Sequence, residues 1–270
     1  KSLTALAVLP LVAACARNEQ QKPNILLIIA DDLGVGDVSA YGYGVIRTPN
    51  IDNLADNGIR FNNGYATSAT STPSRYGLLT GMYPWRNADA RILPGDAPLL
   101  IPVDAPTLPK MMQSEGYQTA AIGKWHLGMG AGNLNWNEQI SPAANEVGFD
   151  YTCLIAATND RVPTVYVEDG RVVGLDPADP IEVDYEENFP GEPDGKTDFH
   201  MLKMMWHHGH NAAIVNGIPR IGYMKGGHSA RWVDEDMADY FVGKVKEFLE
   251  NRDEDKPFFL YYGLHQPHVP

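Results

Sequence analysis

The stretch Asn24–Asp32, NILLIIADD, gives the strongest indication of the fold in this sequence. It holds an uninterrupted run of isoleucine and leucine with no polar alternation, which is typical of a parallel strand buried on both faces. The run ends in two carboxylates, Asp31 and Asp32. In an open parallel α/β sheet the ligand crevice lies at the carboxyl ends of the strands, so we expect both side chains to face it.

Two more apolar runs predict buried strands of the same sheet. They are YQTAAIGKWHLG (117–128) and PFFLYYGLH (257–265). Four basic side chains lie at the ends of these runs or just beyond: Lys124, His126, His265 and His268. Because parallel strands end at one edge of a sheet, we expect several of these groups to meet the two carboxylates.

Helices are predicted between the strands. In the stretch 48–58, Thr48 can cap the helix, Pro49 can occupy its first position and Gly58 can end it. The stretch 71–81 has the same start and stop signals, with Thr72 as the cap, Pro73 at the first position and Gly81 at the end. Ser71 is then expected just outside the helix. A third helix is indicated by apolar residues on one stripe: Val233, Met237, Tyr240, Phe241, Val245, Phe248 and Leu249.

The alternation of strands and helices predicts an α/β fold, a mostly parallel sheet with helices on both faces. The region 148–227 is less regular and contains a plausible hairpin through Asp169 and Gly170. With 270 residues, 44% of them hydrophobic, the chain can bury a substantial core. The net charge of −13 argues against a nucleic-acid partner, because phosphate binding needs clustered Lys and Arg.

The first residues resemble an export signal. A lysine precedes a short apolar run in residues 1–15, and the run ends at Val12-Ala13-Ala14-Cys15, which resembles a bacterial lipobox. We expect a lipoprotein-type signal peptide over 1–15, a linker over 16–22 and lipid anchoring through Cys15 at the periplasm or cell surface. A plain secretory signal with an incidental cysteine is the alternative. Cys153 is the other cysteine of the sequence, so no disulfide scaffold is available after cleavage.

The residues expected at the strand ends suit binding of an oxyanion. Hard carboxylate oxygens favour Ca²⁺ or Mg²⁺. A metal, a helix N-terminus and the cations Arg75 and Lys124 beside the Ser71 hydroxyl would form a pocket for a tetrahedral anion. Taken singly, an Asp pair is a common turn, a hydroxyl is a common cap and a terminal Lys is usually solvated. The joint arrangement is what favours a site.

The helical stretch also carries a specific motif. Ser71-Thr72-Pro73-Ser74-Arg75, followed by Leu79-Thr80-Gly81, resembles the sulfatase signature, Cys or Ser-x-Pro-Ser-Arg with a downstream Leu-Thr-Gly. The Asp31-Asp32 strand end, GKWHLG and HQPHVP fall in the order of that family. The resemblance runs over 23–270 and implies an alkaline-phosphatase-like fold. It identifies this range as an N-terminal catalytic domain that lacks its C-terminal part.

The resemblance implies a chemical modification of Ser71. In the family this residue is oxidised to formylglycine (3-oxoalanine), and a serine there is similar to the type handled by a radical maturase. The hydrated aldehyde carries two hydroxyls, so one can attack sulfur and the other can later expel sulfate. An unmodified serine has a single oxygen and no such route. The family likewise implies that Asp31, Asp32 and residue 71 bind Ca²⁺, with Mg²⁺ less favoured.

The resemblance also assigns roles to the basic groups. Arg75 would orient the diol, Lys124 would bind sulfate oxygens and His126 would be the base that releases sulfate. His268 would donate a proton to the leaving alcohol, whereas His265 is expected to be structural. The family supplies further metal ligands and another lysine from a segment after the HQPHVP strand, which this sequence does not contain.

The substrate expected from the resemblance is a sulfated carbohydrate. Asn159-Asp160-Arg161 and Trp206-His207-His208-Gly209-His210 lie where related bacterial enzymes form their sugar pocket, and the candidates for substrate binding are Asp160, Arg161, His208 and His210. Ordinary loop polarity is the alternative explanation of these residues. Two other functions stay open: a phosphoesterase of the same superfamily, and a non-catalytic lipoprotein that binds sulfated glycans.

Overall fold

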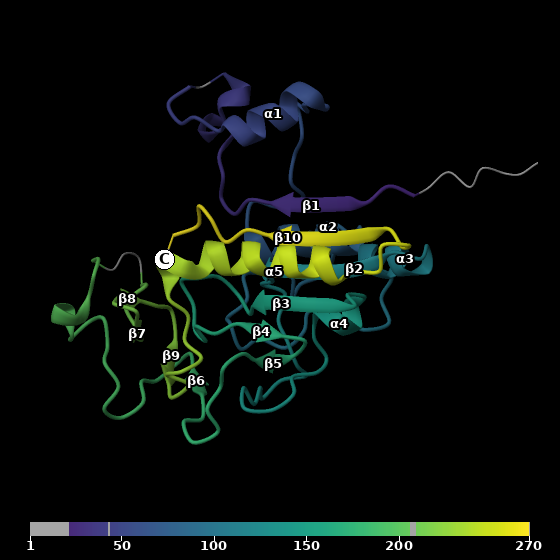
Figure 1. Ribbon diagram of the computed structural model, residues 1–270. Coiled ribbons are helices and arrows are strands. Elements are labelled where there is room, and N and C mark those ends of the chain that lie inside the picture. The colour runs from purple at the N-terminus through teal and green to yellow at the C-terminus, as the bar shows by residue number, and fades with distance from the viewer. Residues whose placement is uncertain (1–21, 43, 206–208, 270) are drawn as a thin grey trace, which may run out of the picture.

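The computed structural model describes residues 22–42, 44–205 and 209–269. A six-stranded sheet forms its centre, in the order β1-β10-β2-β3-β4-β5 (Figure 1). The strands are β1 Ile25–Ile29, β2 Gln118–Lys124, β3 Tyr151–Ile155, β4 Val167–Glu168, β5 Arg171–Val172 and β10 Phe258–Gly263. The three strands expected from the apolar runs are therefore neighbours, with β10 between β1 and β2.

The register of the parallel strands brings their carboxyl ends together. The last residues of β1 and β10, Ile29 and Gly263, are partners, and Lys124 at the end of β2 pairs with Ile155 at the end of β3. The β4–β5 hairpin is antiparallel and turns at Asp169 and Gly170, which have φ of 43° and 78°. This positive-φ pair suits an Asp-Gly hairpin turn, so the predicted hairpin is confirmed.

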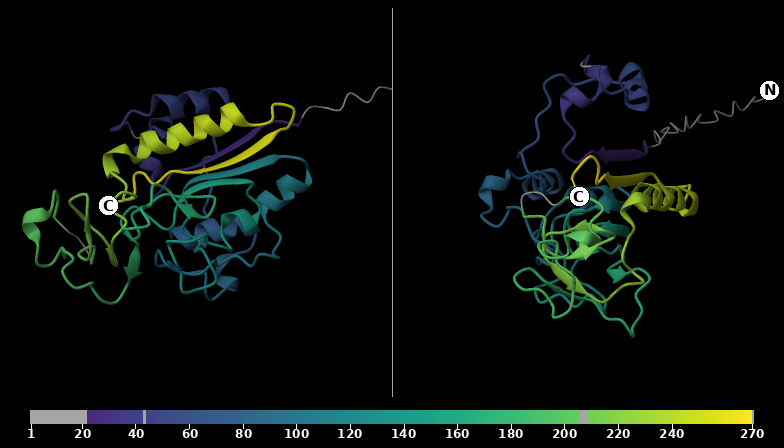
Figure 2. Two further views of the ribbon diagram at one scale, coloured as in Figure 1. Left: turned by 60° about the horizontal axis from the view of Figure 1, so that its bottom comes forward. Right: turned by 90° about the vertical axis from the view of Figure 1, so that its left-hand side faces the viewer.

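Helices cover both faces of the sheet, as the α/β interpretation predicts (Figure 2). On one face Phe259 and Tyr261 pack with residues of α2 (Ser71–Thr80), α3 (Leu108–Ser114) and α4 (Ala144–Val147). On the other face Ile122 and Leu260 pack against α5 (Met237–Asn251). Alternate residues of one strand thus serve two cores, because successive side chains of a strand point to opposite faces.

The first helix differs from its expected packing. The cap and the end of α1 (Pro49–Asn57) lie where Thr48 and Gly58 predict, yet none of its residues is buried. Figure 1 shows α1 beyond β1, on the side away from β10. Leu26 and Ile28 of β1 are both 48% exposed, so the expectation that this strand is buried on both faces was wrong for the described residues. The apolar face of α1 therefore has no core to cover among the described residues.

The stretch between β5 and α5 is irregular, as expected, and lies beyond the carboxyl ends of the parallel strands (Figure 1). Its short strands are β6 Glu182–Asp184 with β9 Tyr223–Lys225, and β7 Ile214–Val215 with β8 Ile218–Pro219. The described 3₁₀ turns are Val35–Asp37, Ser39–Tyr41, Pro84–Arg86, Phe199–Met201 and Asp234–Asp236. Of the helices in the described ranges, none has the length and apolarity needed to cross a membrane.

Candidate active site

Helix α2 begins two residues earlier than its sequence predicts. Thr70 is the N-cap and Ser71 is the first helical residue. The backbone N–H of Ser74 donates to the carbonyl of Thr70 at 3.0 Å, which starts the helical hydrogen bonding there. The predicted cap, Thr72, instead contacts a distant segment, because its hydroxyl donates to the carbonyl of His126 at 2.8 Å. The expected cap was therefore wrong, and Ser71 sits inside the first turn.

Arg75 lies one turn after Ser71 and is almost fully buried. Its Nε donates to Ser71 Oγ at 3.0 Å. Its Nη1 donates to the carbonyl of Lys124 at 3.0 Å and to Tyr261 Oη at 2.7 Å. Its Nη2 lies 3.6 Å from Asp31 Oδ1. One guanidinium thus connects the candidate nucleophile, the end of β2, a residue within β10 and a candidate metal ligand.

Asp31 and Lys124 form a buried ion pair next to Arg75. The Asp31 backbone is also fixed, because its N–H donates to the carbonyl of Gln266 at 2.9 Å. Burial and the charge of Arg75 lower the pKa of Lys124 to about 8, against the opposing effect of Asp31. These three side chains carry one more positive than negative charge when all are ionised. The chain therefore has a local cationic site despite its acidic composition.

His126 follows β2 in a left-handed conformation, with φ of 56°. Its Nε2 lies 2.9 Å from the carbonyl oxygen of Leu93. A carbonyl only accepts, so in the neutral ring Nε2 carries the proton and Nδ1 is the acceptor. Nδ1 is buried and has no hydrogen-bond partner among the described residues. Burial, then the charges of Lys124 and Arg161, hold the pKa of His126 well below its usual value. A neutral imidazole with a free acceptor atom results.

His268 lies beside Asp32, beyond the end of β10. Its Nε2 is 3.7 Å from Asp32 Oδ2, and its Nδ1 is 2.8 Å from the carbonyl oxygen of Val269. The Asp32 side chain is 62% exposed and that of His268 is 14% exposed. Asp32 has φ of 62°, which turns the chain directly after Asp31. The structure therefore brings His268 and both carboxylates to one edge of the sheet.

A second polar cluster adjoins His268. The Asn159 side chain donates to the His268 carbonyl at 3.4 Å. The next residue, Asp160, accepts from Arg161 Nη1 at 2.8 Å and lies 3.2 Å from His210 Nε2. Asp160 is buried, whereas Arg161 and His210 keep 15% and 16% of their side chains exposed. Asp160, Arg161 and His210, three of the candidates for substrate binding, therefore meet.

The sequence singles out two more histidines, His208 and His265. His208, with Trp206 and His207, lies outside the described residues. His265 is buried, with its ring centroid 6.0 Å from that of Phe241. Burial lowers the pKa of His265 to about 4. This position in the core under α5 suits the structural role expected for His265.

The donor set is a partial one for a divalent metal. Asp31 and Asp32 offer the oxygens that Ca²⁺ and Mg²⁺ prefer. However, the described residues hold no group of three or more His, Cys, Asp or Glu side chains placed to bind a metal. The two carboxylates are thus the right type of ligand for such an ion, but they are too few to complete its coordination.

Three contacts of the site were not predicted from the sequence. They are Tyr261 with Arg75, Thr72 with His126, and the Leu93 carbonyl with the His126 ring. Tyr261 sits in a strand that the sequence does predict, but nothing in the sequence indicates that Arg75 reaches it. Threonine is a common N-cap residue, so the hydrogen bond from Thr72 to the distant His126 carbonyl could not be expected from the sequence.

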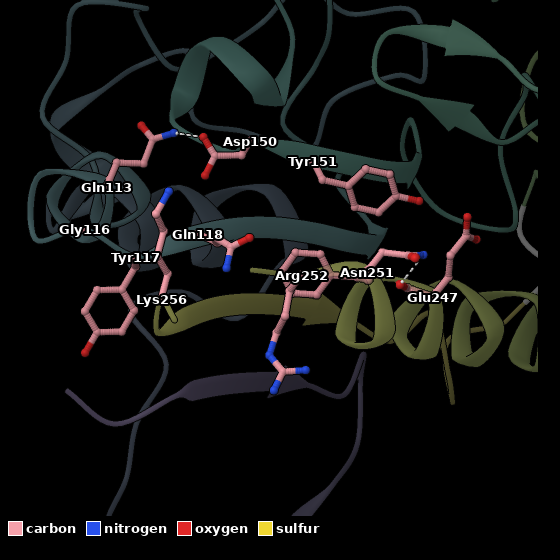
Figure 3. Close-up of a pocket in the computed structure, with 11 residues that line it drawn as sticks. Gln113, Gly116, Tyr117, Gln118, Asp150, Tyr151, Glu247, Asn251, Arg252 and Lys256 are labelled. Carbon is pink, nitrogen blue, oxygen red and sulfur yellow. Dashed lines mark hydrogen bonds between the residues drawn. The ribbon is translucent and has the colours of Figure 1, made fainter. Parts of the chain in front are cut away.

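A cavity of about 660 Å³ lies elsewhere, at the amino ends of the strands (Figure 3). It is lined by residues at the end of α3, the starts of β2 and β3 and the end of α5, among them Gln113, Gln118, Tyr151 and Asn251. Within it Gln113 donates to Asp150 at 2.6 Å. None of the candidate site residues lines this cavity. It is therefore separate from the cluster at the carboxyl ends.

Comparison with known proteins identifies the family of this chain. The sulfatase family profile matches residues 23–270, so the chain belongs to the sulfatase family. It is 53% identical over 251 residues to the N-acetylgalactosamine-6-O-sulfatase of Bacteroides thetaiotaomicron, covering 93% of this chain and 49% of that protein. It is 30% identical over 269 residues to arylsulfatase A of Bos taurus, covering 99% of this chain and 46% of that protein.

Solved structures agree on the fold. One from the glycosaminoglycan metabolism of Bacteroides thetaiotaomicron superposes with a TM-score of 0.90 at 53% identity, over 93% of this chain and 52% of that one. Another, solved in complex with its substrate D-glucosamine-2-N,6-O-disulfate, superposes with a TM-score of 0.51 at 29% identity, over 92% and 35%. The predicted sulfatase fold is confirmed. The chain spans about half the length of the curated relatives it matches.

Proposed function

We propose that the complete protein hydrolyses sulfate monoesters on a sulfated glycan. The observation that carries this proposal is the position of Ser71 at the start of α2, bonded to an arginine that also contacts Asp31 and the Lys124 backbone. An oxyanion needs fixed donors in a site that excludes water, and this buried cationic cluster offers them. Membership of the sulfatase family supports sulfur as the centre attacked.

The nucleophile of this proposal is residue 71 in its oxidised form, formylglycine. The hydrated aldehyde supplies two hydroxyls on one carbon, so that sulfate can be both accepted and released. Arg75 donates to the residue-71 oxygen and cannot be deprotonated, which makes it a permanent donor there. A transient partner, a radical maturase acting on the serine-type motif, would install the aldehyde.

Asp31 and Asp32 would hold a divalent cation, for which calcium is our first choice because carboxylate oxygens suit it. Bound there, the cation would neutralise charge on the sulfate group. Further ligands are needed, since the His, Cys, Asp and Glu side chains of the described residues do not complete a site.

The basic groups have distinct proton states. Lys124, charged below a pKa of about 8, would bind sulfate oxygens. His126 carries its proton on Nε2, and its free Nδ1 would accept the proton whose removal releases sulfate. His268, partly exposed beside Asp32, would give a proton to the departing alcohol.

The cluster of Asp160, Arg161 and His210 would bind the sugar. It adjoins His268 through Asn159, so its position suits the part of the substrate that carries the leaving oxygen. The partly exposed Arg161 and His210 can donate to hydroxyl or anionic groups. A relative named for N-acetylgalactosamine 6-sulfate at 53% identity favours a sulfated hexosamine as the substrate class.

Export is part of the same proposal. A sulfatase anchored through a lipidated Cys15 would meet polysaccharides outside the cytoplasm, which suits the signal-like start of the sequence. Residues 1–21 lie outside the described structure, so this step depends on the sequence alone.

The test uses the complete protein purified from its native host. Mass spectrometry of the peptide that contains residue 71 should show the loss of two hydrogens, and the protein should hydrolyse sulfate esters far faster than the matching phosphate esters. A preference for phosphate esters with an unmodified serine would favour the phosphoesterase alternative. Glycan binding without hydrolysis of either ester would favour the non-catalytic lipoprotein.

A further inference from the structure

The central strand β10 passes directly beside Arg75. Tyr261 of β10 is fully buried, and its Oη accepts a hydrogen bond from Arg75 Nη1 at 2.7 Å. Two residues later, a Cβ at Gly263 would lie 2.9 Å from the same Nη1. The same Cβ would lie 2.5 Å from the Lys124 carbonyl oxygen, so the glycine leaves room both for β2 and for the guanidinium beside this strand.

Every nitrogen of the guanidinium is directed at a partner. Nε is directed to Ser71 Oγ, Nη1 to the Lys124 carbonyl and Tyr261 Oη, and Nη2 toward Asp31. Of these partners, Ser71 belongs to the sulfatase motif, and Asp31 and Lys124 lie at strand ends. Tyr261 is an uncharged residue within a strand. Burial raises the pKa of Tyr261, so the phenol stays neutral and the pair stays an ordinary charge-assisted hydrogen bond.

We infer that Tyr261 is a positioning residue for Arg75, and that its hydroxyl holds the guanidinium where Nε can donate to the oxygen of residue 71. This inference rests on the proposed function for its effect on turnover. Without the hydroxyl, Nη1 keeps only the Lys124 carbonyl, and the guanidinium loses one of the contacts that fix its orientation. The donor to residue 71 then loses its fixed direction, because a hydrogen bond weakens as its angle departs from linear.

The chain offers a matched control in the next residue. Tyr262 lies in the same strand, but it is half-buried and packs with the core on the opposite face, against residues of α5. Tyr261→Phe and Tyr262→Phe each remove one phenol oxygen from β10 and leave the motif at 71–75 unchanged. A general weakening of the strand would affect both variants.

The experiment compares these two variants in the complete, matured protein. For Tyr261→Phe we expect kcat on a sulfate ester to fall about tenfold with KM nearly unchanged, since small misplacements of a positioned group cost this much or more. Tyr262→Phe should keep the wild-type kcat. The aldehyde content at position 71, measured by mass spectrometry, should be equal in all three proteins. Added to Arg75→Lys, Tyr261→Phe should cause less than a twofold further loss, because both changes act through one interaction.

A second readout does not depend on sulfatase activity. The Arg75 Nε–H signal in ¹⁵N NMR should exchange with water faster in Tyr261→Phe than in wild type or Tyr262→Phe. Unchanged exchange, a wild-type kcat in Tyr261→Phe, or equal losses in both tyrosine variants would each overturn the inference. If the matured wild type hydrolyses no sulfate ester, the proposed function fails, and the NMR comparison alone then decides whether Tyr261 positions Arg75.

Discussion

Arg75 Nε donates to Ser71 Oγ across 3.0 Å, one helical turn apart on α2. The same guanidinium reaches Asp31 and the Lys124 carbonyl, so its planar fork links three elements at once. Lysine has a single nitrogen at its tip and cannot make these contacts together. We therefore expect Arg75→Lys to lower kcat by about 10²-fold to 10³-fold, the usual cost of one lost oxyanion donor.

The Arg75→Lys measurement needs the aldehyde content at position 71, because Arg75 belongs to the motif that the maturase would read. The kcat is then calculated per aldehyde. Arg86→Lys is the control, since Arg86 is exposed and outside the cluster. Full turnover per aldehyde in Arg75→Lys would contradict the role of Arg75.

Thr72 provides the second prediction. Its hydroxyl donates to the His126 carbonyl at 2.8 Å, and His126 holds a left-handed conformation with φ of 56°. Thr72→Val keeps the shape but leaves that buried carbonyl without its donor, at a cost of about 1–3 kcal/mol in the free energy of unfolding. Thr72→Ser keeps the donor and should restore both stability and kcat.

The Thr72 comparison is read from urea unfolding and from kcat per aldehyde in the valine and serine variants. Position 72 is the variable position of the signature, so maturation should continue in both. If the serine variant is as impaired as the valine variant, the methyl packing matters and the hydrogen bond does not.

The part of the site predicted from the sequence lies at the ends of buried strands. Asp31, Lys124 and His268 could be placed because each follows an apolar run, and parallel strands end at one edge. The α/β architecture followed from the same runs. Local sequence patterns are enough for these residues, because the position of each side chain is set by the strand that precedes or contains it.

The contacts that could not be predicted depend on packing between distant elements. The bond between Arg75 and Tyr261 joins residues 186 positions apart and requires α2 to pack on the sheet face that carries Tyr261. The start of α2 was misplaced because Thr72 bonds to His126, 54 residues away, and leaves the cap to Thr70. The exposure of α1 could not be foreseen, because Ile51, Leu54 and Ala55 indicate one apolar helix face but not what covers it.

His268 gives a prediction about leaving groups. A sugar alkoxide needs a proton as it departs, whereas nitrophenolate leaves without one. His268→Ala should therefore lower kcat/KM by about 10²-fold or more on a sugar sulfate and by much less on nitrophenyl sulfate. The ratio of the two losses is the measurement, and equal losses would remove His268 as the general acid.

The sugar cluster gives a prediction about specificity. His210 lies 3.2 Å from Asp160 and is partly exposed. His210→Ala should raise KM for a sulfated hexosamine roughly tenfold, the equivalent of about 1.4 kcal/mol, and leave nitrophenyl sulfate unaffected. The control is His228→Ala, because His228 forms a similar pair with Asp179 at 2.8 Å on the exposed surface. Equal effects on both substrates would argue against a sugar-binding role for His210.

His265 predicts how stability depends on pH. Burial lowers its pKa from 6.5 to about 4 in the folded protein, so between these values the unfolded chain binds more protons. The contribution of the neutral ring to the free energy of unfolding is fully present above pH 6.5. It is lost as pH falls toward 4, by up to about 3 kcal/mol. The pKa of His126 is lowered too, which adds a loss of the same sign. In His265→Gln the free energy of unfolding, measured in urea, should fall less between pH 6.5 and 4.5 than in wild type. His200→Gln, at an exposed position, should keep the wild-type dependence. A His265→Gln protein with the full wild-type loss would show that the buried ring does not cause it.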